Sequence, residues 1–180
     1  PKPSSAASDV YKRQAPLVPQ GAAISIRFPD RTMASLQHLS KLGVFPAAWL
    51  PTFVGLVRKH ATVLITGGTG VGKTTLLKAL LAQCDVNERI VTVEEVRELG
   101  ELGRGDHVSL VTREANVEGV GAISLADLVK ATLRMRPDRV VLGECRGAEI
   151  VDLLRAFNSG HHGGMTTVHA DGVDRVPSRL

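Results

Sequence analysis

The chain has 180 residues, of which 43% are hydrophobic and 22% charged, as in an ordinary globular domain. Its formal net charge of +4 suits anionic partners such as nucleotides, nucleic acid or lipid headgroups, although a mild basic excess is more often only solvated surface. The sequence shows no signal peptide and no apolar run near the ~20 residues that span a bilayer. Its two cysteines, Cys84 and Cys145, lack the spacing of a metal site, and we expect them to be reduced thiols of a cytosolic protein.

The first 57 residues predict a leader, one strand and two helical segments. Residues 1–14 are polar without periodicity, and we interpret them as a disordered or foreign leader. Alternating apolar and polar residues predict a strand over 22–28. A helix is predicted over 33–42, with Thr32 as a candidate N-cap, and a second helical pattern covers 45–60. We interpret residues 15–57 as the remnant of an N-terminal domain followed by linker helices.

A glycine-rich turn joins a predicted strand (61–66) to a predicted helix (74–83). Its sequence fits G-x-x-x-x-G-K-[ST], a loop whose backbone N–H groups surround phosphate oxygens at the positive end of a helix. In this pattern Lys73 lies near the β- and γ-phosphates, and Thr74 offers its hydroxyl to Mg²⁺. The alternative is a turn that binds nothing, but the match in this context favours a nucleoside triphosphate. The predicted binding residues are Gly67, Gly68, Thr69, Gly70, Val71, Gly72, Lys73, Thr74 and Thr75.

Beyond this loop, strand and helix patterns alternate, which predicts an α/β fold with a sheet that is mostly parallel at its centre. Ligands of such sheets bind at the carboxyl ends of the strands. The predicted strands are 89–94, 107–112, 139–143 and 164–169, and the predicted helices are 124–135, with Ser124 and Asp127 as a capping box, and 147–158.

Carboxylates follow two of these strands. Glu94, Glu95 and Glu98 come at the end of the first, where they can polarise an attacking water or organise Mg²⁺; a solvated acidic turn is the alternative. A second nucleotide-site strand has four apolar or small residues and then an acid, here Glu144, with Gly143 at the usual aspartate position. Metal contact is therefore expected from Glu144, directly or through water. A buried strand that happens to end in glutamate is the alternative.

Histidine and arginine side chains complete the candidate set. His169 ends the last predicted strand and can sense the γ-phosphate by hydrogen bonding, although a structural role is an equal alternative. We interpret His161 and His162 as loop residues rather than metal ligands. Four arginines near strand or helix ends can neutralise phosphoryl charge from the same or a neighbouring subunit, or form surface ion pairs: Arg113, Arg134, Arg136 and Arg146.

Four boxes thus occur in order over about a hundred residues: a Walker A loop (67–75), an acidic box (94–98), a Walker B segment (140–144) and a histidine box (166–169). In these boxes the chain from about Ala22 to Leu180 resembles the secretion ATPases of type II and type IV secretion systems and of type IV pili. Residues 112–119 and 133–139 look most like the CpaF/TadA-type ATPases of tight-adherence pili, to which conjugative type IV secretion ATPases are close relatives.

The resemblance implies a RecA-like P-loop ATPase core over 58–180, incomplete at its C-terminus, in a protein that hydrolyses ATP with Mg²⁺. It implies a ring of six subunits at the cytoplasmic face of the inner membrane, with inner-membrane platform proteins of a pilus or secretion system as partners and no nucleic acid. Because most of the N-terminal domain and the helices after Leu180 are missing, we expect this fragment by itself to be inactive and not to assemble, even if the full-length protein does both.

Site roles also follow from the resemblance. It implies that Lys73 and Thr74 hold phosphate and Mg²⁺, that Glu98 activates water, and that Glu144 is the Walker B acid and metal contact. His169 is then the histidine-box residue, and Arg113 is the arginine of a T-R-x-x-N motif. Two departures are Glu95, where aspartate is usual, and Val96, where proline or threonine is common.

Two other function classes remain open at this stage. A RecA-like DNA-translocating ATPase is compatible with the P-loop and with the sequence pI near 9.4, but aromatic residues for base stacking are few. An inactive nucleotide-binding module is the other alternative. A GTPase or an ABC transporter is disfavoured because neither the guanine-reading N-K-x-D motif nor the L-S-G-G-Q signature is present.

Overall fold

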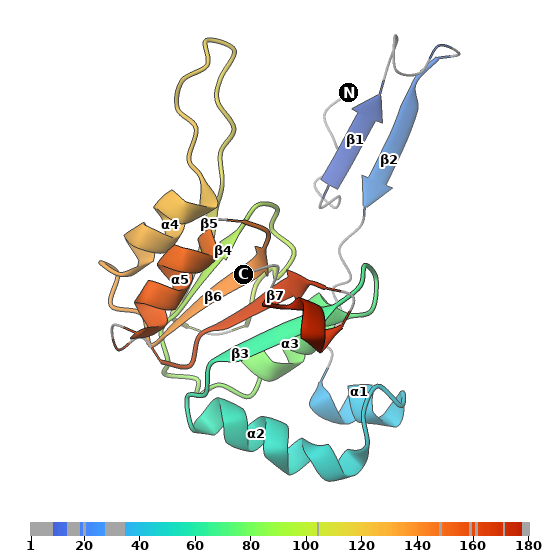
Figure 1. Cartoon of the computed structure of the whole chain (residues 1–180), viewed down its shortest axis with the longest axis vertical. Helices are drawn as coiled ribbons and strands as arrows, with labels where there is room; N and C mark the ends of the chain where they lie inside the picture. The colour runs from blue at the N-terminus through green and yellow to red at the C-terminus, as the bar shows by residue number, and fades with distance from the viewer. Residues whose placement is uncertain are drawn as a thin grey trace.

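A five-stranded sheet forms the centre of the molecule (Figure 1). The computed structural model describes residues 9–13, 19, 21–27, 35–103, 105–147, 149–158, 160, 162–170 and 172–177. The strand order is β3-β7-β6-β4-β5, and every neighbouring pair is parallel, which confirms the predicted α/β fold with a parallel centre. The strands are β3 (Val63–Gly67), β4 (Ile90–Glu94), β5 (His107–Val111), β6 (Arg139–Cys145) and β7 (Met165–His169).

Helices cover both faces of this sheet. The predicted core helices are present, with ends shifted by a few residues, and Ser124 and Asp127 form the expected capping box. The second N-terminal pattern is a 3₁₀ turn that continues into a helix with Pro51 in its first turn, where a missing N–H costs nothing. The helices are α1 (Leu36–Lys41), η1 (Ala47–Trp49), α2 (Leu50–Arg58), α3 (Lys73–Leu81), α4 (Leu125–Thr132), α5 (Glu149–Asn158) and η2 (Val173–Arg175).

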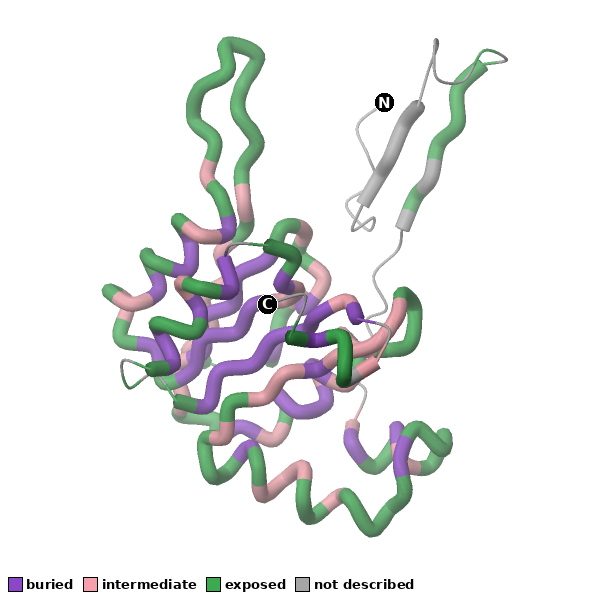
Figure 2. Tube along the Cα trace, viewed as in Figure 1, coloured by how far each residue is buried: buried purple, intermediate pink, exposed green. Residues whose placement is uncertain are grey.

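Alternation along the central strands divides the apolar core into two layers. Val141 and Met165 pack in one layer, which also holds buried residues of α1, α2 and α3. Val140 and Leu142 point the other way, into a layer closed by α4 and α5. The central strands are accordingly buried along most of their length (Figure 2). This packing fixes where the carboxyl ends of the strands lie.

A buried ion pair ties three segments together at the opposite, amino edge of the sheet. Arg139, at the start of β6, is fully buried and pairs with Glu88. Its guanidinium also donates to the carbonyls of Val57 (2.7 Å) and Gly163 (3.1 Å). The end of α2, the loop before β4 and the loop before β7 are therefore held by one cation.

The N-terminal segment differs in part from the prediction. Asp9–Arg13, within the leader that we set aside as disordered, forms β1 and pairs antiparallel with β2 (Ala23–Arg27), the strand predicted over 22–28. Such pairing uses backbone N–H and C=O groups that every sequence carries, so a short polar strand leaves little trace in composition. The foreign origin of residues 1–14 stays a prediction.

The first helix begins later than predicted. Thr32, its expected N-cap, lies outside the described residues; α1 begins at Leu36, and the Ser35 hydroxyl accepts the His38 N–H at 3.1 Å. No helix within the described residues combines the length and apolar character needed to cross a membrane.

Candidate functional site

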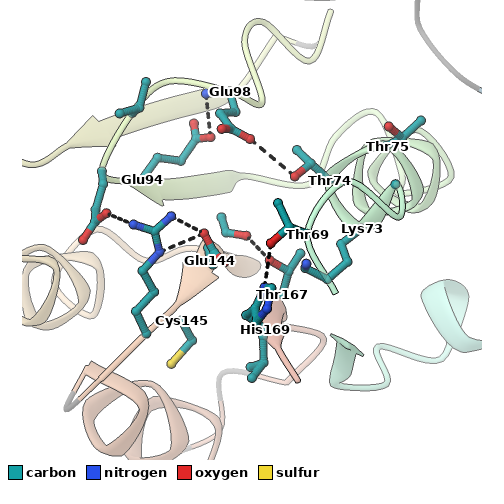
Figure 3. A pocket seen from close by; sticks show the side chains of 17 residues that line it. Thr69, Lys73, Thr74, Thr75, Glu94, Glu98, Glu144, Cys145, Thr167 and His169 are labelled. Carbon is teal, nitrogen blue, oxygen red and sulfur yellow. Dashed lines mark hydrogen bonds and ion pairs between the residues drawn. The ribbon is translucent and has the colours of Figure 1, made fainter. Parts of the chain in front are cut away.

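A cleft of about 690 Å³ lies at the carboxyl edge of the sheet. Residues from the loop after β3 and from the ends of β4, β6 and β7 line it, as expected for a ligand site in a parallel α/β sheet. In Figure 3 the side chains of Lys73, Thr74, Glu98, Glu144 and His169 surround one space. The structure therefore brings together residues that lie up to about a hundred positions apart in the sequence.

The glycine-rich loop runs from β3 into α3. Gly72 precedes the helix with φ of 91°, a left-handed conformation that glycine adopts without strain. The Lys73 ammonium donates to the carbonyls of Gly67 (2.9 Å) and Gly68 (2.7 Å), so the lysine lies across its own loop. Of the predicted binding residues, Thr69, Gly70, Gly72, Lys73, Thr74 and Thr75 line the cleft.

The last strand brings the predicted histidine to this loop. β7 pairs with β3 in a register that sets His169 opposite Gly67. The Nδ1 atom of His169 lies 3.4 Å from the Thr69 hydroxyl. The histidine therefore lies next to Thr69 and can contact a group that the loop binds.

Glu98 faces the other side of the loop. The Thr74 hydroxyl donates to Glu98 Oε2 at 3.4 Å, although these residues belong to different elements. The N–H groups of Glu98 and Leu99 both donate to Oε1 of Glu94, at 3.0 and 2.8 Å. Glu94 is almost completely buried, and this burial raises its pKa, more than the two N–H groups lower it.

Glu144 is paired with an arginine that sequence reasoning singled out only as one of four. Arg146 donates to Glu144 Oε2 through Nε (2.9 Å) and Nη2 (2.6 Å), and to Glu95 Oε2 through Nη1 (2.9 Å). The hydrogen bonds to Glu144 are the main reason that the pKa of Arg146 is raised. This guanidinium neutralises part of the acidic wall of the cleft.

Two further lining residues were given no role by the sequence: Thr167, within the histidine box, and Cys145. Thr167 donates to the Gly143 carbonyl at 2.8 Å and so connects β7 to β6. Cys145 also lines the cleft; burial raises the pKa of its thiol to about 12, so it stays neutral. Cys84 and Cys145 are thiols rather than halves of a disulfide, as predicted. The closeness in sequence of Thr167 and Cys145 to His169 and Glu144, which the boxes do indicate, is the signal that could have identified them.

Other predicted residues lie elsewhere. Arg113 pairs with Ile123 at the base of a loop that projects beyond β5 and α4 (Figure 1), and its Nε donates to the Gly121 carbonyl at 2.6 Å. Arg113, Arg134 and Arg136 are not among the residues that line the cleft. His161 lies outside the described residues, and His162 is exposed.

The oxygen donors of the cleft suit a hard cation such as Mg²⁺. Thr74 supplies a hydroxyl, and Glu98 and Glu144 supply carboxylates. Within the described residues, no three acidic, histidine or cysteine side chains cluster closely enough to hold a metal by themselves. Mg²⁺ is usually held by one or two carboxylates together with substrate phosphates, so this donor set fits an ion that binds with a triphosphate.

Comparison with known proteins agrees with this geometry. The profile of a family described as "Type II/IV secretion system protein" matches residues 5–180. A putative conjugal transfer protein of Mycobacterium tuberculosis is 46% identical over 166 residues, which are 92% of this chain and 47% of that protein. Type IV secretion system protein PtlH of Bordetella pertussis is 43% identical over 124 residues, which are 69% of this chain and 37% of that protein.

A solved structure is also similar. The VirB11 ATPase of the Brucella suis type IV secretion system, determined in complex with sulphate, superposes with a TM-score of 0.63 and 26% identity over 92% of this chain and 57% of that one. This likeness confirms the RecA-like fold. The chain spans less than half of the two curated relatives named above. Because the matched segment contains the whole cleft and all four boxes, the chain belongs to the type II/IV secretion system protein family.

Proposed function

We propose that the protein containing this chain is an ATPase that converts ATP and water to ADP and phosphate with Mg²⁺. The observation that carries the proposal is that Lys73, Thr74, Glu98, Glu144 and His169 face one cleft at the carboxyl edge of the sheet. Lysine and glycine N–H groups are there to bind phosphate, and a carboxylate is there to take a proton.

The roles follow from position. Lys73 exchanges its contacts with the loop carbonyls for the β- and γ-phosphates, and the loop N–H groups bind the same oxygens. Thr74 and Glu144 would hold Mg²⁺, directly or through water. When bound, the ion neutralises phosphate charge. Glu98 accepts the proton of the water that attacks the γ-phosphorus, while the bond to the bridging oxygen breaks and ADP leaves. His169 hydrogen-bonds the γ-phosphate.

In the cell, we propose that this hydrolysis powers pilus assembly or protein secretion. The family membership supports this role, and the acting unit would be a ring of subunits, six in our proposal, at the cytoplasmic face of the inner membrane. Its partners would be inner-membrane platform proteins. Within the family we keep the CpaF/TadA-type pilus ATPase as the proposed subtype, on the basis of residues 112–119 and 133–139.

A Glu98→Gln variant of the full-length protein tests the catalytic assignment. Gln keeps the size of the side chain but cannot accept the proton, so kcat should fall by about 10²-fold or more while ATP still binds. Glu101→Gln is the matched control, because Glu101 is an exposed acid of the same segment that does not line the cleft. Unchanged turnover in Glu98→Gln would remove Glu98 from the mechanism.

A conjugative type IV system or a DNA-translocating ATPase is the second candidate. The observation that favours it is the conjugal transfer name of the Mycobacterium tuberculosis relative. Direct action on DNA predicts that DNA stimulates hydrolysis and that the stimulation falls steeply with salt. Hydrolysis that is indifferent to DNA at low salt would favour the protein-secretion or pilus role.

A further inference from the structure

Glu94 is a charged side chain in an unusual place. It ends β4, a strand with neighbours on both sides, and it is only 3% exposed. A carboxylate so deeply buried destabilises a fold unless its oxygens find donors. Its contacts therefore indicate what it does for the cleft that it lines.

One of its oxygens holds the backbone of the acidic box. Oε1 accepts the N–H groups of Glu98 (3.0 Å) and Leu99 (2.8 Å). These two bonds fix the turn that follows β4, and the side chain of Glu98 then reaches Thr74. Glu94 thus acts on the glycine-rich loop through Glu98.

The other oxygen receives no hydrogen bond from the described residues. Oε2 is buried and has no hydrogen-bond partner in the part of the chain that the structure describes. Because two donors already converge on Oε1, the orientation of the carboxylate is determined by the turn rather than by Oε2. The buried acid is therefore oriented for its contact with Glu98.

Gly143 on the neighbouring strand provides the room for this side chain. A Cβ added at Gly143 would lie 3.0 Å from Glu94 Cγ and 3.4 Å from Oε1. The strand cannot easily shift, because the Gly143 carbonyl accepts the Thr167 hydroxyl from β7. A side chain at 143 would therefore force the Glu94 side chain to move by a few tenths of an ångström from its observed position.

We propose that Glu94 is a positioning residue of this site, which occupies the space left by Gly143 and holds the backbone of Glu98 so that the Glu98 carboxylate faces Thr74. The effect on turnover rests on the proposed ATPase function. The hydrogen bonds that Glu94 accepts from Glu98 and Leu99 do not depend on that function, so they can be tested separately.

The test uses Glu94→Ala and Glu94→Gln in the full-length protein. Ala removes the acceptor, so kcat should fall by about 10²-fold, the scale of a small misplacement of a catalytic group, while KM changes less than about threefold. Gln keeps a carbonyl oxygen for the two N–H groups and should restore kcat to within about tenfold of wild type. Hydrogen exchange of the peptide 95–102 should speed up in Ala but not in Gln, with the peptide 63–75 unchanged.

Gly143→Ala provides a second route that leaves Glu94 in place. Its new Cβ displaces Glu94, so it should reproduce the loss of kcat and the faster exchange, and it should add little in a Glu94→Ala background, where the clash is gone. Gly105→Ala is the matched control, because a Cβ there meets nothing within 4 Å.

The two proposals can fail separately. Unchanged exchange over 95–102 in Glu94→Ala, or additive effects of the two substitutions, would overturn the positioning role whether or not ATP is hydrolysed. A wild-type protein without ATPase activity, but with the exchange pattern described above, would overturn the proposed function and leave the positioning role intact.

Discussion

The Lys73 side chain is oriented both by contacts with its own loop and by the position of the residue at the start of α3. Its ammonium lies across the loop on two backbone carbonyls, and its Cα begins α3, so the side chain is oriented before any ligand arrives. A pre-oriented cation loses less side-chain freedom on binding. At the residue scale, this lysine should therefore matter for affinity.

We expect Lys73→Ala to weaken ATP binding by at least about tenfold, because a direct charge contact with the phosphates is lost. Its effect on the free energy of unfolding should be small, about 1 kcal/mol or less, since the two carbonyls belong to a partly exposed loop. Equilibrium titration with ATP and chemical denaturation measure the two quantities. Lys78→Ala, on the same helix but outside the cleft lining, is the control; equal affinities for the two variants would contradict the assignment.

The residues of the glycine-rich loop were predictable because their chemistry depends on local spacing. The contact of Arg146 with Glu95 and the burial of Glu94 were not predictable in this way. These depend on which strands are neighbours, and the order β3-β7-β6-β4-β5 is not written in any local pattern. The sequence therefore predicts the members of the site better than their mutual contacts.

At the element scale, Arg139 and Glu88 connect the linker helix to the sheet. The guanidinium contacts the end of α2 and the loop before β7, while Glu88 lies in the loop before β4. Burial by itself would raise the pKa of Glu88, but the hydrogen bond and charge of Arg139, together with the smaller effects of the Asp85 N–H and of His60, lower it, so the pKa lies below its usual value of 4.5. The ionised pair therefore stabilises the folded protein.

This pair predicts a pH dependence of stability. Glu88 binds its proton less readily in the folded than in the unfolded state, so its contribution is complete above about pH 4.5 and is lost as the pH falls through the lower, folded-state pKa. Glu88→Gln leaves a buried arginine without its counter-charge and should cost about 3 kcal/mol at pH 7. In denaturant titrations, the gap between wild type and variant should narrow as the pH falls below 4.5. Glu118→Gln, an exposed acid, should show no such gap; a gap that is constant with pH would refute the linkage.

Helices and strands were predicted more accurately than their connections. Ser124 with Asp127, and the apolar runs of β4 and β6, are local signals, and the structure has these elements where they were expected. The antiparallel partner of β2 was missed because its pairing is made by the backbone, and the fully buried Arg139 was not anticipated because its partners come from three separate segments.

At the scale of the whole molecule, Arg113 is a predicted site residue that does not line the cleft of its own subunit. Arg113 lies at the base of the projecting loop, bonded to the Gly121 carbonyl, and does not line the cleft. In the ring that we propose, such a loop can reach the cleft of an adjacent subunit, and arginines commonly stabilise phosphoryl transfer from a neighbouring chain. We therefore expect Arg113 to act between subunits.

Mixing two inactive variants of the full-length protein tests this expectation. Arg113→Ala should lower kcat by about 10³-fold, the lower range for an arginine of this kind, without weakening ATP binding to the isolated subunit. Lys73→Ala has a defective cleft but an intact Arg113. If Arg113 serves the neighbouring cleft, rings assembled from both variants contain interfaces where an intact cleft meets an intact arginine, and activity should exceed that of either variant alone. Arg134→Ala, which removes another arginine outside the cleft lining, should remain active by itself. Mixed rings no more active than the separate variants would place the action of Arg113 within its own subunit or remove it from the mechanism.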